Sequence, residues 1–186
     1  MAETSVVPIV PPVAAASYSS DQPILRPART PRAKKISDYG KQLAEKQKAK
    51  REYGLREAQF RRYFKLASHS SFATGQALLT LLERRLDNVL YRSGIAKTRP
   101  MARQLVNHGL VRVNGVTVSI PSYCVNSGDA ITLKKAGVFE YNKEVVMPDW
   151  LSYATKTKTA NVERIPKDSD LVTDFNTQLI IEFYSR

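Results

Sequence analysis

Arginine side chains at helical spacing are the most chemically distinctive residues of this sequence. Arg99 and Arg103 stand four residues apart, and Arg85 and Arg92 stand seven apart, so each pair falls on one face of an α-helix. The guanidinium group is planar, permanently charged and able to hydrogen-bond two phosphate oxygens at once. The pattern predicts recognition of a phosphate backbone rather than the making or breaking of covalent bonds.

Residues suited to nucleophilic catalysis and metal binding are scarce. The chain has one cysteine, Cys124, and two histidines, His69 and His108, far apart in the sequence. A lone cysteine excludes a disulfide within the chain and favours a reducing compartment, and the three residues cannot form a structural zinc site. We therefore expect no enzyme activity, no cofactor and no metal, with Cys124 as a small packed side chain.

Positive charge is concentrated in two segments of the 186-residue chain, whose formal net charge is +12. Residues 34–65 hold eleven basic and four acidic residues, and residues 81–112 hold seven basic and two acidic ones, whereas residues 139–186 are net acidic. Such an excess attracts polyanions, so nucleic acid is the leading predicted partner and an anionic membrane the second. Solvated helix faces are the alternative interpretation. No apolar run approaches the roughly 20 residues of a membrane-spanning helix.

Residues 1–33 are rich in Pro, Ala and Ser and predict a flexible arm without a core of its own. The arm turns basic toward its end, and a segment of this kind can order on a phosphate surface. Its first twenty residues lack a charged start followed by an uninterrupted apolar core, which argues against a secretory signal.

Two helices are predicted in the first basic segment. Ser37 is a suitable N-cap for a helix that reaches Glu52, and Gly54 separates this helix from a second one over residues 55–67. Core packing is the favoured role of the aromatic residues in the second helix, with base stacking as the alternative; these residues are Phe60, Tyr63 and Phe64.

The second basic segment predicts two further helices and a small sheet. Apolar periodicity indicates one helix over residues 76–93, closed by Gly94, and Thr98 caps a short helix that Gly109 ends. Alternating valines and Ile120 flank an Asn-Gly pair, which favours a two-residue hairpin turn. A further strand follows Gly128, Asp129.

The stretch 81–135 closely resembles the S4 RNA-binding domain, in its RLDNVLYR, TRPMARQLVNHG, VNG, IPSY and GD motifs. The preceding KISDYGKQLAEKQKAKREYGLREAQFRRYFKLA is similar to the segment before that domain in bacterial-type small-subunit ribosomal proteins S4. The ending, PDWL and then ERIPKDSDLVTDFNTQLIIEFYSR, is similar to the end of those proteins. The resemblance covers roughly residues 34–186.

The resemblance implies an α+β fold with an inserted domain. A basic helical flank at 34–78 would be completed by the C-terminal segment 148–186, and the S4 domain at 79–147 would lie between them in sequence, after the flexible arm of 1–33. By composition QLIIEFY is equally compatible with a strand, and only the resemblance implies a helix there.

The same resemblance implies a structural constituent of the cytoplasmic small ribosomal subunit. Family members bind rRNA of the 5′ domain early in assembly, line the mRNA entrance beside ribosomal proteins S3 and S5, and contribute to translational accuracy. Basic residues just before the SDYG motif line that entrance; here they are Arg29, Arg32, Lys34 and Lys35. The residues expected to contact rRNA are Lys48, Arg51, Arg61, Arg62, Arg85, Arg92, Lys97, Thr98, Arg99, Arg103 and His108.

Several alternatives stay open at this level. Glu83–Arg103 or Asp87–Arg ion pairs would use some of these charges within the fold, and His108 is equally suited to cap its helix. A stand-alone S4-domain RNA chaperone or stalled-ribosome binder is the main functional alternative, although such proteins carry a basic tail. A pseudouridine synthase would need a much larger catalytic domain. If Arg99 and Arg103 face RNA, reversing both charges should abolish binding without unfolding the chain.

The chain departs from the family pattern in two further places. Many bacterial members begin with a longer folded region, sometimes with a cysteine zinc site, where this chain has its Pro-rich arm. Many also carry a longer basic helix before the PDWL motif, where this chain has only KKAGVFEYNKEVVM.

Overall fold

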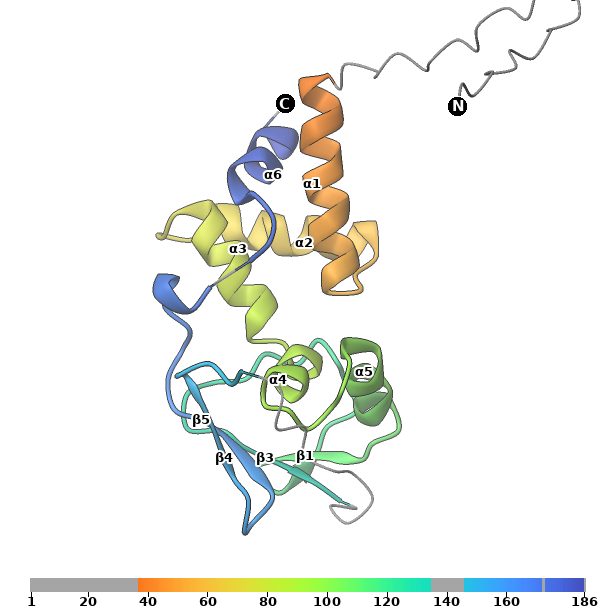
Figure 1. Cartoon of the computed structure of the whole chain (residues 1–186), viewed down its shortest axis with the longest axis vertical. Coiled ribbons are helices and arrows are strands. Elements are labelled where there is room, and N and C mark those ends of the chain that lie inside the picture. The colour runs from red at the N-terminus through yellow and green to blue at the C-terminus, as the bar shows by residue number, and fades with distance from the viewer. Residues whose placement is uncertain (1–36, 135–145, 172, 186) are drawn as a thin grey trace, which may run out of the picture. The chain divides into compact units, whose positions relative to one another are not determined.

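The computed structural model describes residues 37–134, 146–171 and 173–185. The predicted arm and its basic residues Arg29, Arg32, Lys34 and Lys35 lie outside these ranges. In chain order the helices are α1 (Asp38–Glu52), α2 (Glu57–Ser68), α3 (Thr74–Glu83), α4 (Leu86–Arg92), α5 (Arg99–Asn107), the 3₁₀ helix η1 (Asp168–Asp170) and α6 (Thr177–Tyr184). The strands are β1 (Val111–Val113), β2 (Val116–Thr117), β3 (Ala130–Leu133), β4 (Leu151–Ala154) and β5 (Thr159–Val162) (Figure 1).

Helices α1, α2, α3 and α6 enclose one of two apolar cores, so the C-terminal helix packs beside the first helix of the described chain (Figure 1). The predicted N-cap is confirmed, since the Ser37 hydroxyl accepts a hydrogen bond from the Gly40 amide at 3.2 Å. The aromatic residues Phe60, Tyr63 and Phe64 belong to this core, as predicted. The C-terminal QLIIEFY segment is helical, in agreement with the family resemblance.

The helix predicted over residues 76–93 is two helices, and this is a correction. The chain is extended at Arg85, where it bridges to Cys124. The Leu86 amide donates to the Tyr123 carbonyl at 2.8 Å, and the Val125 amide donates to the Arg84 carbonyl at 2.9 Å. Because these bonds replace the helical ones, α3 ends and α4 starts in a new direction.

The five strands form one antiparallel sheet in the order β2-β1-β3-β5-β4. The predicted hairpin is confirmed: Asn114 and Gly115 both have positive φ, at 50° and 81°, as a primed turn requires. The strand predicted to reach Ile120 ends at Thr117: the Val118 amide still donates to the Val111 carbonyl at 3.1 Å, and the chain then continues to Cys124, which bridges to Arg85.

The hairpin formed by β4 and β5 was not predicted from the sequence. It extends the sheet through antiparallel pairing of β5 with β3, with Ile131 opposite Ala160. Residues after β5 then return to the helices through η1 and α6. The C-terminal segment therefore contributes both to the sheet and to the helical core.

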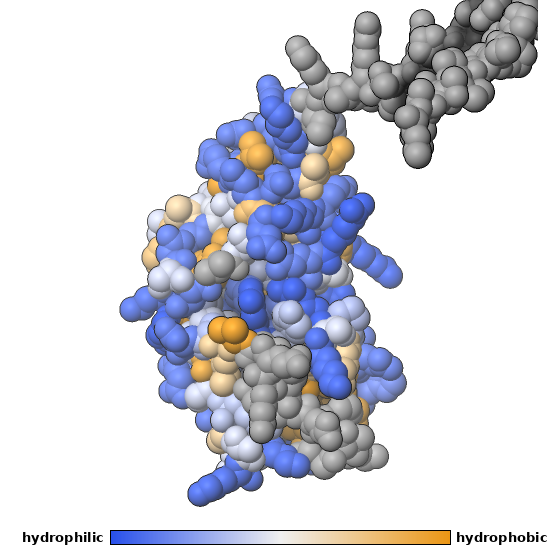
Figure 2. Space-filling view, viewed as in Figure 1, coloured by the Kyte–Doolittle hydropathy of each residue, from blue (hydrophilic) through white to orange (hydrophobic). Residues whose placement is uncertain are grey.

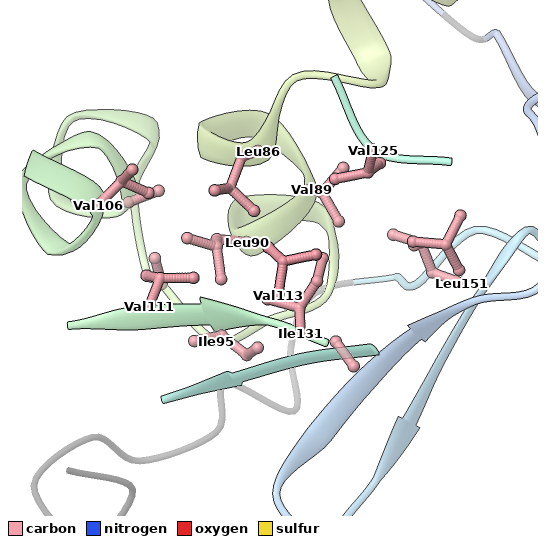
Figure 3. Close-up of a cluster of buried hydrophobic side chains, with 14 of the residues drawn as sticks. Leu86, Val89, Leu90, Ile95, Val106, Val111, Val113, Val125, Ile131 and Leu151 are labelled. Atoms are coloured by element: carbon pink, nitrogen blue, oxygen red, sulfur yellow. The ribbon is translucent and has the colours of Figure 1, made fainter. Parts of the chain in front are cut away.

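The second apolar core lies between the sheet and helices α4 and α5, which cover one of its faces (Figure 3). Its fully buried side chains include Leu86, Val89 and Leu90 of α4, opposite Val111 and Ile131 of the strands. Among the described residues, no helix is long and apolar enough to cross a membrane.

Candidate nucleic-acid interface

A cleft of about 310 Å³ brings together basic residues that are far apart in the sequence. Arg51 at the end of α1 faces Arg99, Arg103 and His108 of α5 and its C-cap, and all four were predicted to contact rRNA. We call it the α1–α5 cleft. Its other lining residues are Glu52, Tyr53, Gly54, Pro100, Gln104 and Asn107.

Arg103 fastens α5 to the turn that follows α1. Its guanidinium donates to the carbonyl oxygens of Gly54 and Tyr53, at 2.5 and 3.1 Å, and to Asp87 Oδ2 at 2.7 Å. Gly54 fits this contact because its φ of +59° suits glycine, and a Cβ there would lie 3.1 Å from Arg103 Nη1. The charge of Arg103 is therefore largely satisfied within the protein.

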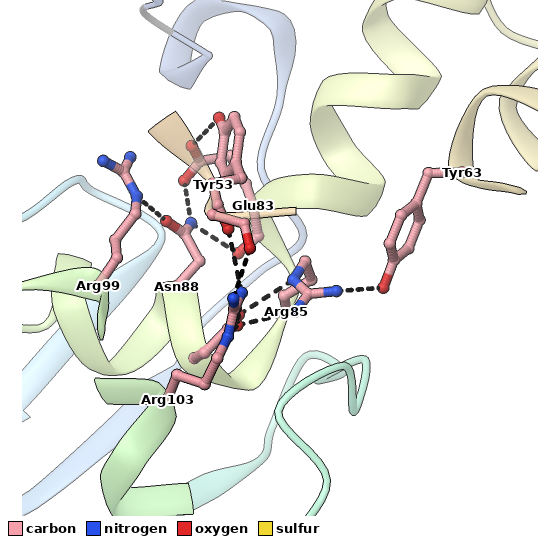
Figure 4. Close-up of polar contacts among 9 residues, drawn as sticks. Tyr53, Tyr63, Glu83, Arg85, Asn88, Arg99 and Arg103 are labelled. Atoms are coloured by element: carbon pink, nitrogen blue, oxygen red, sulfur yellow. Dashed lines mark hydrogen bonds and ion pairs between the residues drawn. The ribbon is translucent and has the colours of Figure 1, made fainter. Parts of the chain in front are cut away.

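Arg99 is held from three sides. Its Nε donates to Asn88 Oδ1 at 2.9 Å (Figure 4), and its Nη2 donates to Glu52 Oε1 at 3.1 Å. The guanidinium also lies over the rings of Tyr53 and Tyr91, with centroids at 5.0 and 4.6 Å, a cation–π arrangement. A phosphate at this side chain would meet a group whose position is already fixed.

Two buried carboxylates, Glu83 and Asp87, bind arginines of the S4 domain, and Figure 4 shows Glu83 among its partners. Glu83 accepts hydrogen bonds from the Tyr53 hydroxyl at 2.7 Å and from Arg92 at 2.9 Å. Asp87 accepts from Arg85 and Arg103, both at 2.7 Å. Of the alternative pairings considered above, those of Asp87 are present, whereas Glu83 pairs with Arg92 and not with Arg103.

Arg85 lies inside the fold, which argues against its predicted direct contact with RNA. Only 3% of the residue is exposed, and its guanidinium also donates to the Tyr63 hydroxyl at 2.6 Å. Burial lowers the pKa of Arg85, but the hydrogen bonds and charge of Asp87 outweigh it and raise the pKa overall. Arg85 therefore remains charged and serves to bind Asp87.

Three arginines of α1 and α2 have the opposite environment. Arg51, Arg61 and Arg62 are exposed, and no ion pair forms at any of them within the described ranges. Lys48 is exposed too, and its ammonium group donates to the Asp174 carbonyl. Hydrophilic side chains dominate the face shown in Figure 2. These exposed charges are available to a polyanion.

The remaining predicted residues lie at the ends of α5. The Thr98 hydroxyl accepts from the Met101 amide at 3.3 Å, which confirms the predicted N-cap, and Lys97 beside it is exposed. His108 is an exposed C-cap residue that lines the cleft. Asn107, which was not predicted, also lines the cleft; it lies four residues after Arg103 and shares its helix face.

Comparison with known proteins gives two matches to family models and many close relatives. The S4 domain model matches residues 84–131, and the ribosomal protein S4/S9 N-terminal domain model matches residues 19–83. The small ribosomal subunit protein uS4 of Halothermothrix orenii is 45% identical over 163 residues, which span 83% of this chain and 78% of that protein. The chain belongs to the uS4 family. The predicted family resemblance is confirmed.

Two other uS4 proteins show the same degree of likeness. That of Chloroflexus aurantiacus is 47% identical over 165 residues, covering 83% of this chain and 80% of its own length. That of Stenotrophomonas maltophilia is 46% identical over 166 residues, covering 84% and 79%. The boundary between the S4/S9 N-terminal domain match and the S4 domain match, at residues 83 and 84, falls where α3 ends and the chain turns toward α4.

Proposed function

We propose that this uS4 protein is a structural constituent of the small ribosomal subunit that binds rRNA of the 5′ domain directly and early in assembly. The observation that carries the proposal is the α1–α5 cleft, together with the exposed cations of α1 and α2. The cleft joins the flank before the S4 domain to the S4 domain itself, so one RNA surface would contact both.

The proposed mechanism separates a rigid frame from a charged surface. Arg51, Arg61 and Arg62 would displace counterions from phosphates, which gives an affinity that falls steeply with salt. The ion pairs of Glu83 and Asp87 would fix the distance between the α1–α5 cleft and the exposed arginines of α1 and α2. Because A-form helices hide their bases, a fixed arrangement of cations recognises backbone geometry rather than sequence. Lys97, just before α5, and the cleft residues Arg99, Arg103 and His108 would complete the proposed contact.

A role at the mRNA entrance is part of the proposal and rests on family resemblance. The basic residues Arg29, Arg32, Lys34 and Lys35 would face mRNA beside ribosomal proteins S3 and S5, and would contribute in this way to translational accuracy. Deletion of residues 1–33 should leave rRNA affinity nearly intact and change activity on structured mRNA.

The experiment that tests rRNA recognition is a salt-dependent titration of the full chain against the 5′ domain of small-subunit rRNA. An unrelated structured RNA of equal length serves as competitor. Binding that survives the competitor supports a primary rRNA binder. Equal affinity for both RNAs would contradict the proposal and favour a stand-alone RNA chaperone, which binds through charge alone.

A further inference from the structure

A groove of about 870 Å³ lies where α2 and α3 meet the loop after β5. We call it the α2–α3 groove. It shares no lining residue with the α1–α5 cleft, so the proposed rRNA contact does not account for it. Its apolar lining comprises Leu66, Phe72, Ala77, Leu81, Ile165 and Pro166.

Large hydrophobic side chains are exposed in this groove to an unusual degree. Phe72 is 72% exposed, Leu66 53% and Ile165 45%. These are three of the seven large hydrophobic residues that the described part of the chain exposes, and they gather in one depression. Contiguous exposed apolar surface of this kind marks an interaction site in a soluble protein.

The rim of the groove is positively charged. Arg84, Arg164 and Lys167 line it, and none of its lining residues, all of them described, is acidic. Arg84 donates to the Val125 carbonyl at 2.9 Å and to the Asn126 side chain at 2.6 Å, so no carboxylate offsets its charge. Arg164 pairs with Asp170. The occupant that complements this rim carries negative charge beside apolar groups.

The apolar floor distinguishes a protein occupant from RNA. An RNA backbone would cover aliphatic side chains with phosphates and gain nothing from them, and base stacking needs planar rings. Phe72 is the one aromatic residue of the lining, and the groove has room for several side chains. We propose that the α2–α3 groove binds another protein through an acidic amphipathic segment. Apolar side chains on one helical face would fill the groove, with carboxylates at Arg84 and Lys167.

The test uses a fluorescent helical peptide of about 16 residues, with Leu and Phe at i, i+3, i+4 and i+7 and Glu elsewhere. Fluorescence anisotropy with the full chain should show saturable binding. The double variant Phe72→Ser with Ile165→Ser should weaken it at least about tenfold, because both side chains belong to the floor. Val116→Ser is the matched control: Val116 is also exposed but lies on β2, and its loss should change nothing.

Charge is tested separately from the apolar floor. Lys167→Gln should weaken the peptide about threefold at low salt. A peptide with Lys in place of each Glu should not bind. The proposal is overturned if the acidic peptide does not bind, if the double variant binds it as wild type does, or if a single-stranded RNA oligonucleotide displaces it.

The groove and the proposed rRNA site can fail independently. The double variant should keep wild-type affinity for 5′-domain rRNA, because neither residue lines the α1–α5 cleft. Parallel loss of rRNA and peptide binding would make the groove an RNA surface and overturn the protein-docking proposal.

Discussion

The arginines around Glu83 and Asp87 and the arginines on α1 and α2 are the same residue type in opposite surroundings. Arg85, Arg92, Arg99 and Arg103 each bind a carboxylate within the fold. Arg51, Arg61 and Arg62 are exposed, and within the described ranges no carboxylate pairs with them. The arginines of the first group hold α5 in place against α1 and α4. Those of the second group are free for a ligand.

The net charge of a segment is therefore not the charge that it offers to a partner. Residues 81–112 carry a net charge of +5, yet four of their arginines are ion-paired. The expectation that Arg99→Glu with Arg103→Glu spares the fold is therefore revised, because Arg103→Glu would place a second carboxylate against Asp87. Substitutions in the first group should lower stability, and substitutions in the second group should lower rRNA affinity.

The largest effect should come from Asp87→Ala. Its removal leaves Arg85 buried without its ion-pair partner, which should lower the free energy of unfolding by about 3–5 kcal/mol. Chemical denaturation measures this loss. The matched control is Asp38→Ala, whose exposed pair with Lys41 should contribute less than about 1 kcal/mol. Equal losses would show that burial of the Asp87 pairs is not what makes them stabilising.

The converse variant, Arg51→Gln with Arg61→Gln and Arg62→Gln, should bind rRNA about 10- to 100-fold more weakly at unchanged thermal stability. Each lost phosphate contact should also flatten the slope of log affinity against log salt by about 0.7–0.9. Lys156→Gln, an exposed lysine in the β4–β5 turn, is the control. Unchanged rRNA affinity in the triple variant would remove these three arginines from the proposed site.

Gly54→Ala tests the contact between Arg103 of α5 and the turn after α1. The residue needs a positive φ, which costs other residues about 1–2 kcal/mol, and its new Cβ would crowd the Arg103 guanidinium. Gly115→Ala has the same backbone requirement with no atom within 4 Å. Thermal unfolding should show the larger loss for Gly54→Ala. A larger loss for Gly115→Ala would argue against a structural role for the Arg103 contact.

The smallest effect should be a pH dependence at Glu57. Partial burial raises the pKa of this carboxyl, but hydrogen bonds from Lys46, Tyr184 and Lys50 outweigh it and lower the pKa below 4.5. Its stabilisation is therefore present above about pH 4.5 and lost as pH falls through the lower folded value. Because Glu57 is 46% exposed, we expect less than about 1 kcal/mol.

Glu57→Gln should flatten the stability profile below about pH 5, measured by denaturation at several pH values. Tyr184→Phe, which removes one donor and keeps both lysines, should flatten it less. An unaltered profile in Glu57→Gln would contradict the assignment.

Local features of the fold were predictable from the sequence. Ser37 and Thr98 cap their helices, Gly54, Gly94 and Gly109 end helical segments with positive φ, and Asn114 and Gly115 form the hairpin turn. Each depends on backbone conformations that neighbouring residues settle by themselves. The α2 aromatics also lie in the core, because periodicity identifies an apolar face without knowing what it packs against.

The break between α3 and α4 and the β4–β5 hairpin required the tertiary structure. Hydrogen bonds from residues 121–125 replace those of a continuous helix at Arg85, and β5 becomes a strand by pairing with β3. Both depend on partners distant in sequence. The same holds for the site: the sequence alone determined that arginines would bind anions. Which of them bind Glu83 and Asp87 follows from the fold, because folding places those carboxylates in a buried environment where they must be paired.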